Sequence, residues 1–166
     1  MLYSISTLNQ MSQDDFTIAL GEIFEKTPSI ARNTWNSRPF LDLKNLHQKM
    51  VFVMNELNQE EQLELLRSHP DLGSKAKMAE ASVREQKGVG LDCLSPEEFQ
   101  QFRALNQAYR EKFGFPFIIA VKNHTKTSIL EAFDCRLNNE WQIEKQQALK
   151  EIADIACFRL QNIIKE

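Results

Sequence analysis

A histidine stands in the pentapeptide HPDLG, at the end of a run that reads as a helix. His69 directly precedes Pro70, and a residue before proline is disfavoured in the α-helical region. We therefore predict that the helix stops here and that the imidazole projects from a bend. Because a histidine titrates at ~6.5, such a ring can move protons near neutral pH. An ordinary surface turn is the alternative that the pentapeptide leaves open.

A cluster of polar residues lies in the segment SVREQ. Ser82, Glu85 and Gln86 stand at positions i, i+3 and i+4, so a helix places them on one face. Together, a hydroxyl, a carboxylate and an amide can bind a ligand that is rich in N–H and C=O groups. The alternative is a helix face in water, where charged helical residues are usually found.

One arginine interrupts the apolar face of the last predicted helix. Arg159 lies inside an arc of apolar residues that recur at helical spacing. A guanidinium cannot be deprotonated to ease its burial, so it needs an acceptor there. We expect an ion pair with an internal carboxylate, a side chain that reaches the surface, or a contact with an anionic ligand.

The segment FGFPFIIAV is apolar, follows a helix stop and contains Pro116. We predict a short, buried, extended segment over residues 115–121. In a helical protein this segment has no neighbouring strand, so its N–H and C=O groups need other partners. Core packing explains the side chains, whereas a planar polar ligand could pair with the backbone.

The elements that must hold these residues are helices. Capping residues, glycines and prolines divide the chain, and residues 28–39 are expected to be irregular. The predicted helices cover roughly residues 14–26, 41–57, 59–68, 75–87, 95–113, 126–137 and 140–164. The strongest start signal is SPEE, where a capping serine and a proline precede a glutamate. The prediction is an all-α, single-domain bundle of about seven or eight helices over residues 1–166, with one short extended buried segment at 115–121.

Composition argues against several classes of function. The 166 residues carry a formal net charge of −3 without a lysine or arginine cluster, so nucleic acid is not an expected partner. No apolar run approaches the ~20 residues of a membrane span, and the amino terminus does not resemble a secretory signal. The three cysteines share no C-x-x-C spacing, so neither a disulfide framework nor a zinc site is expected. We expect a cytoplasmic protein.

These motifs, taken together, resemble one family. The resemblance lies in HPDLG, in the stretch from SVREQ to FGFPFIIAVK, in the late RLNNEWQIEKQQALKEIADIACFRL and in the early FEKTPSIARNTWNSRPF. They are similar to the 2-oxo-4-hydroxy-4-carboxy-5-ureidoimidazoline (OHCU) decarboxylases over nearly the whole chain. The resemblance implies an all-helical, homodimeric carboxy-lyase of urate breakdown. Such an enzyme converts OHCU to (S)-allantoin and CO₂ with no metal and no organic cofactor.

The resemblance also implies site residues. The histidine of the HP pair is the family's catalytic acid or base, which makes His69 the expected proton carrier, with Glu85 and Arg159 as the other catalytic residues. The expected substrate-binding residues are Pro70, Ser82, Gln86, Phe117, Ile118, Ile119, Ala120 and Val121. Two other functions stay open: a non-catalytic helical module that binds a purine-derived ureide, and a lyase or hydrolase that acts on a related ureide.

Overall fold

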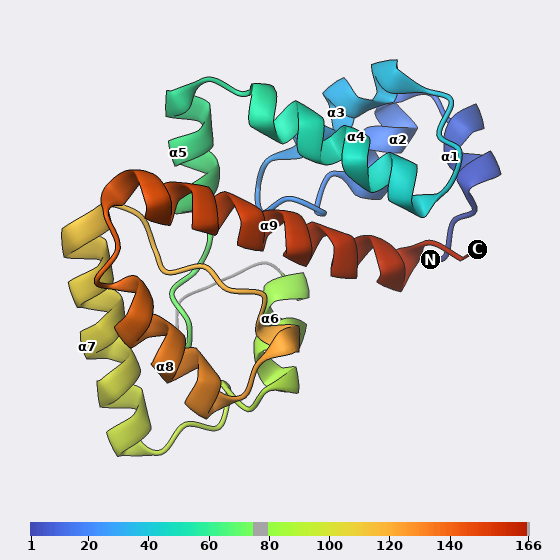
Figure 1. The fold of residues 1–166 in the computed structure, drawn as a ribbon. Helices are drawn as coiled ribbons and strands as arrows, with labels where there is room; N and C mark the ends of the chain where they lie inside the picture. The colour runs from blue at the N-terminus through green and yellow to red at the C-terminus, as the bar shows by residue number, and fades with distance from the viewer. Residues whose placement is uncertain (75–79, 166) are drawn as a thin grey trace. The chain divides into compact units, whose positions relative to one another are not determined.

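The backbone of residues 1–74 and 80–165, which the computed structural model describes, folds mainly into helices (Figure 1). These residues form nine α-helices, two 3-10 helices and one isolated bridge. The all-α prediction is therefore confirmed. No helix within these ranges is both long enough and apolar enough to cross a lipid bilayer.

The chain divides into two compact units. Unit 1 comprises Met1–Leu65 and Ala153–Glu166, and unit 2 comprises Leu66–Ile152. Along the chain the helices are α1 (Ile5–Gln10), α2 (Gln13–Leu20), α3 (Pro28–Thr34), η1 (Trp35–Ser37), α4 (Leu43–Glu56), α5 (Gln59–Ser68), α6 (Glu80–Gly88), α7 (Pro96–Phe113), η2 (Val121–Asn123), α8 (Lys126–Arg136) and α9 (Trp141–Ile163). The first part of α9 thus belongs to unit 2 and its last part to unit 1.

The interior of unit 1 is apolar. Leu46 and Met50 on α4 are fully buried, and the rings of Phe16 and Phe40 stack with their centroids 5.6 Å apart. The start of the chain is tied to the end of α9, because the Tyr3 N–H donates to the Ile163 carbonyl at 2.8 Å.

The helix predicted over residues 14–26 was too long. The observed helix α2 ends at Leu20, and Lys26 has a φ of 48°, which no right-handed helix contains. The prediction of an irregular stretch over 28–39 was wrong for its first part. Pro28 occupies the first turn of α3, where a missing N–H costs nothing because no partner would be available.

The later helices agree better with the sequence. Helix α5 has the predicted bounds, and the ends of α7, α8 and α9 lie within one residue of the predicted ones. Of the helix predicted over 75–87, residues 75–79 lie outside the described residues, and the described part belongs to α6.

The predicted start of α7 is confirmed. The Ser95 Oγ accepts the Glu98 N–H at 3.1 Å, and the Glu98 carboxylate accepts the Ser95 N–H at 3.0 Å. Hydrogen bonding from the Ser95 backbone, with Lys126 nearby, holds the pKa of Glu98 below its ordinary value. At the other end Gly114 adopts a φ of 79°, a left-handed conformation that glycine reaches without strain.

An aromatic cluster fills unit 2 and holds the segment that follows α7. The Phe117 and Phe133 rings stack with centroids 3.7 Å apart, and Tyr109 meets Phe117 edge to face at 5.3 Å. All three residues are fully buried. Aromatic pairs of this kind add to the free energy of burial, so the segment around Phe117 is fixed by its side chains.

Candidate active site

His69 lies on the bend that follows α5, as the sequence predicted. The helix ends at Ser68, and the His69 N–H donates to the Leu66 carbonyl at 3.3 Å. The residue is only 6% exposed. The surface-turn alternative was therefore wrong, because a side chain in such a turn would be open to water.

The polar cluster on α6 faces inward. Ser82 and Gln86 are 4% and 7% exposed, and Glu85 is half-buried. The residues between them, Val83 and Arg84, are exposed. This alternation is typical of an amphipathic helix whose buried side carries polar groups, so the alternative of a water-facing cluster was wrong.

Gln86 connects α6 to the loop that contains His69. Its Oε1 accepts the Gly73 N–H at 3.0 Å. Gly73 has a φ of +67°, and a Cβ there would lie 2.7 Å from the Leu94 side chain. Glycine is thus required for the close approach of this loop. Because Asn106 Nδ2 also donates to the Leu72 carbonyl at 2.9 Å, the loop is fixed to α7 as well.

A cavity of about 380 Å³ borders the same loop. It is lined by residues 71–74 and by one face of α7, where Arg110 Nε donates to the Asp71 carboxylate at 2.8 Å. None of the site residues predicted from the sequence lines it. The predicted site therefore lies elsewhere.

The predicted buried segment is present but ends one residue early. Phe117, Ile118, Ile119 and Ala120 are at most 4% exposed and lie outside any helix. Val121, predicted to be extended, instead begins η2. Since η2 packs against α6, the end of this segment lies beside the helix that carries the polar cluster (Figure 1).

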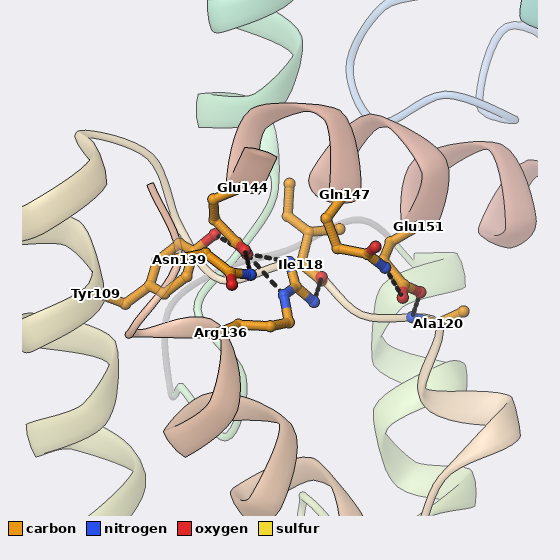
Figure 2. A network of polar contacts seen from close by, with 8 residues as sticks. All are labelled: Tyr109, Ile118, Ala120, Arg136, Asn139, Glu144, Gln147 and Glu151. Carbon is orange, nitrogen blue, oxygen red and sulfur yellow. Dashed lines mark hydrogen bonds and ion pairs between the residues drawn. The ribbon is translucent and has the colours of Figure 1, made fainter. Parts of the chain in front are cut away.

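Two charged side chains bind the backbone of this segment. Figure 2 shows Arg136 of α8 and Glu151 of α9 pointing toward it. Arg136 Nη1 donates to the Ile118 carbonyl at 2.7 Å, and Glu151 Oε2 accepts the Ala120 N–H at 2.9 Å. The partners that the extended backbone needed are therefore side chains of two helices.

Arg136 is itself held by a buried carboxylate. Its Nε donates to Glu144 Oε1 at 2.6 Å, and Glu144 is fully buried. The same carboxylate accepts the Tyr109 hydroxyl at 2.6 Å and Asn139 Nδ2 at 3.0 Å. Burial, together with the nearby Glu144, raises the pKa of the Tyr109 phenol well above its ordinary value. The hydroxyl thus stays protonated and remains a donor.

Sequence reasoning missed this network, although a signal was present. Arg136 stands three and seven residues after Phe133 and Ile129, which are buried on α8. Glu144 stands four residues before the buried Ala148 on α9. Charged residues at buried helical spacing were noticed at Arg159, and the same test would have identified this pair.

Peptide geometry fixes the direction of the backbone N–H and C=O of Ile119. In a planar trans peptide the C=O and the N–H point in opposite directions. Because Arg136 holds the Ile118 carbonyl and Glu151 holds the Ala120 N–H, the N–H and the C=O of Ile119 both point away from these side chains. No described residue forms a hydrogen bond with either group. Buried backbone groups of this kind normally have a partner, so they suit a polar ligand.

Arg159 belongs to unit 1 and forms a buried ion pair there. Its Nη2 lies 3.1 Å from the Glu25 carboxylate, and Nη1 donates to the Glu22 and Ile23 carbonyls at 3.3 and 3.4 Å. Arg159 and Glu25 are 5% and 1% exposed. Of the alternatives for Arg159, the structure thus contains the internal carboxylate, and its contact with an anionic ligand stays a prediction.

Unit 2 gathers most of the predicted site. It contains His69, Pro70, Ser82, Glu85, Gln86 and residues 117–121. A hydrogen bond joins α6 to the loop that follows His69, and packing joins α6 to η2 at the end of residues 117–121. Among the described residues, no three His, Cys, Asp or Glu side chains are grouped so that they could hold a metal ion. The arrangement offers an imidazole, a carboxylate, an amide and a backbone N–H and C=O at Ile119 that no described residue bonds.

Comparison with known proteins shows which family the chain matches. It matches the OHCU decarboxylase family over residues 9–161, a range that includes parts of both units. It is 40% identical over 160 residues to a 2-oxo-4-hydroxy-4-carboxy-5-ureidoimidazoline decarboxylase of Halalkalicoccus jeotgali, covering 96% of this chain and 91% of that protein. It is 45% identical over 165 residues to the uric acid degradation bifunctional protein of Bacillus subtilis, covering 99% of this chain and 33% of that protein. A crystal structure of (S)-allantoin synthase superposes with a TM-score of 0.77 at 28% identity, covering 98% of this chain and 54% of that chain.

The Glu25–Arg159 pair makes a prediction about stability. Arg159→Met should lower the free energy of unfolding by ~3–5 kcal/mol, because it leaves a buried carboxylate without its charge partner. The double variant with Glu25→Met should recover much of this loss, as measured by urea unfolding. Arg32→Met is the control, since it removes an exposed pair with Asp14 and should cost at most ~1 kcal/mol. Equal losses for Arg159→Met and Arg32→Met would contradict a stabilising buried pair.

The Glu144 network makes a second prediction. Tyr109→Phe should lower the free energy of unfolding by ~1.5–3 kcal/mol, because it removes a hydrogen bond to a buried charge. The chain has only one other tyrosine, Tyr3, and no described residue bonds its hydroxyl. Tyr3→Phe should therefore change stability by less than ~0.5 kcal/mol. The network is not stabilising if thermal or urea unfolding shows the two variants to be alike.

Proposed function

This chain belongs to the OHCU decarboxylase family, which consists of carboxy-lyases, and we propose that it converts OHCU to (S)-allantoin and CO₂ in urate breakdown. The observation that carries the proposal is the pair of backbone groups of Ile119, its N–H and its C=O. The residue is buried, the two groups point away from the side chains that hold the adjoining backbone groups, and no described residue bonds them. A flat ligand with alternating N–H and C=O groups, such as a ureide ring, fits these groups.

The chemistry of OHCU suits a site without a metal. Its carboxylate is attached to a carbon that carries a hydroxyl and lies next to a ring C=N bond. When the bond to the carboxylate breaks, CO₂ leaves and the electron pair moves into the C=N, so the substrate is its own electron sink. A proton must then reach the former C=N carbon, which carries the ureido group, from one face, while the hydroxyl loses its proton and becomes the ring carbonyl. The face that is protonated decides the enantiomer. The protein must therefore orient the substrate and deliver a proton.

Different described residues can orient the substrate and deliver the proton. We assign the proton to His69, the imidazole of the predicted motifs. Glu85 accepts hydrogen bonds from ureido or ring N–H groups, and Gln86 donates through Nε2, to which no described residue bonds. Ile119 offers one N–H and one C=O to the edge of the ring. Ser82 and Pro70 complete the binding set.

Arg159 is the third proposed catalytic residue. Its role is to bind the substrate carboxylate or an oxygen on which negative charge develops, as a guanidinium can do with two parallel hydrogen bonds. Its pairing with Glu25 fixes the direction of the guanidinium within unit 1. This assignment rests on the family resemblance and on the chemistry of an anionic substrate.

Further parts of the proposal concern the state of the enzyme. We propose that it needs no metal and no organic cofactor, that it acts as a homodimer and that it works in the cytoplasm. The electron sink in the substrate supports the first statement. The resemblance to the family supports the second, and the cysteine pattern, which favours a reducing compartment, supports the third.

The proposed function is tested with freshly generated OHCU and chiral analysis of the product. The wild-type protein should accelerate formation of the S enantiomer, whereas spontaneous decay gives a racemate. His69→Asn should keep the fold and reduce turnover by ~10²–10⁴-fold, because the general acid or base is lost. His47→Asn is the matched control, since His47 bonds the Ala153 carbonyl in unit 1 and should leave the rate near that of wild type.

Two outcomes of this assay would be decisive. Binding of (S)-allantoin without any acceleration would indicate a non-catalytic ureide-binding module. Full activity of a folded His69→Asn variant would remove His69 from the mechanism.

Chelation tests the cofactor-free chemistry. Treatment with EDTA followed by dialysis should leave the rate unchanged, because the substrate stabilises its own carbanion and no metal-ligand set is expected. The measurement is the initial rate before and after treatment, with metal content determined in the same samples. Activity that falls with EDTA and returns with one divalent ion would contradict the proposal.

A further inference from the structure

The carboxylate of Glu151 binds the backbone at Ala120. We propose that Glu151 is a positioning residue of the decarboxylase site, which fixes the direction of the Ile119 carbonyl by binding the N–H of the same peptide group. This inference rests on the proposed function, because it deepens the role assigned to the Ile119 peptide. Neither the composition of the chain nor the motifs of the sequence assigned any role to Glu151.

The carboxylate is held in one orientation. Its Oε2 accepts the Ala120 N–H at 2.9 Å, and its Oε1 accepts Gln147 Nε2 at 2.9 Å. Gln147 stands one turn earlier on α9, so the two side chains lie on the same face of that helix. Figure 2 shows both pointing toward the segment at Ala120. A carboxylate that is bound at both oxygens cannot rotate freely.

Because the peptide group is planar, fixing its N–H also fixes the direction of its C=O, which is the Ile119 carbonyl. The Ala120 N–H and the Ile119 C=O belong to one planar trans peptide, so they point in opposite directions. When Glu151 binds the N–H, the Ile119 carbonyl must point away from α9. Without that bond the peptide could rotate, because no other described residue bonds its N–H or its C=O.

The charge of Glu151 complements that of Arg136. Arg136 binds the Ile118 carbonyl of the preceding peptide at 2.7 Å, and that peptide carries the Ile119 N–H. An anion on one peptide and a cation on the next polarise them, so that the Ile119 carbonyl becomes a better acceptor and its N–H a better donor. The two charges therefore prepare both groups for a polar ligand.

Glu151 allows a cleaner test than Arg136. Arg136 is buried against Glu144, so its removal would destabilise the fold. Glu151 is half-buried, and Glu151→Ala should fold. Glu151→Gln retains an oxygen that can accept the Ala120 N–H. Glu131→Ala is the matched control, because Glu131 is an exposed carboxylate on α8 that bonds no described residue.

The experiment compares these variants in turnover, in binding of (S)-allantoin by calorimetry and in hydrogen exchange of the Ala120 amide. Glu151→Ala should raise KM and the allantoin Kd about 10-fold, the loss of one good hydrogen bond, with a smaller change in kcat. In the Glu151→Ala variant the Ala120 amide should exchange faster. The enantiomeric excess of the product should also fall, measured at an enzyme concentration at which the catalysed reaction is faster than spontaneous decay. The KM and the allantoin Kd of Glu151→Gln should stay within about threefold of wild type. Those of Glu131→Ala should equal the wild-type values.

A merely structural role would give a different pattern. Glu151→Ala would then lose stability while keeping KM, allantoin affinity and enantiomeric excess, and this result would overturn the inference. Equal defects in Glu151→Ala and Glu151→Gln would also overturn it, because the acceptor oxygen would then not matter. If wild type binds allantoin but does not accelerate OHCU decay, the proposed function fails while the allantoin Kd of the variants still decides the role of Glu151. If wild type neither accelerates OHCU decay nor binds allantoin, both proposals fail.

Discussion

One segment, residues 117–120, runs through the interior of unit 2 with no strand of the described residues beside it, and its backbone depends on a buried ion pair. Buried N–H and C=O groups need partners, and Arg136 supplies one to the Ile118 carbonyl. A buried guanidinium needs a counter-charge in turn, which Glu144 provides. Tyr109 and Asn139 then satisfy the remaining capacity of that carboxylate. Helices α7, α8 and α9 are thereby joined through a single charged group.

This constraint has a consequence for chemistry. Because charged side chains hold the peptides on both sides of Ile119, its own N–H and C=O each point away from the charge that holds the same peptide. A backbone that is fixed in this way can orient a planar ureide without any movement at the moment of reaction. A decarboxylation in which the substrate accepts its own electrons requires such orientation and a proton, and His69 lies in the same unit. In the proposed mechanism the protein therefore holds the substrate in one orientation and delivers a proton.

The second buried pair, Glu25–Arg159, follows the same principle in unit 1. A charge that is removed from water must be compensated, and here a carboxylate and two carbonyls do so. The match to the OHCU decarboxylase family spans residues 9–161 and thus includes both pairs. Among the described residues, the buried arginine and glutamate side chains are those of these two pairs, and each pair fixes a guanidinium in one direction.

The sequence by itself determined the helical class, the bend at His69, the polar face of α6 and the start of α7, because each depends on residues within one or two helical turns. It also indicated that Arg159 is buried, since helical spacing alone reveals an interrupted apolar face. Only the tertiary structure decided that Glu25 is the partner of Arg159 and that Arg136 and Glu151 bind the extended backbone. Those contacts join residues 134, 18 and 31 positions apart. A local pattern shows that a buried charge or peptide needs a partner, but the choice of partner is made by packing.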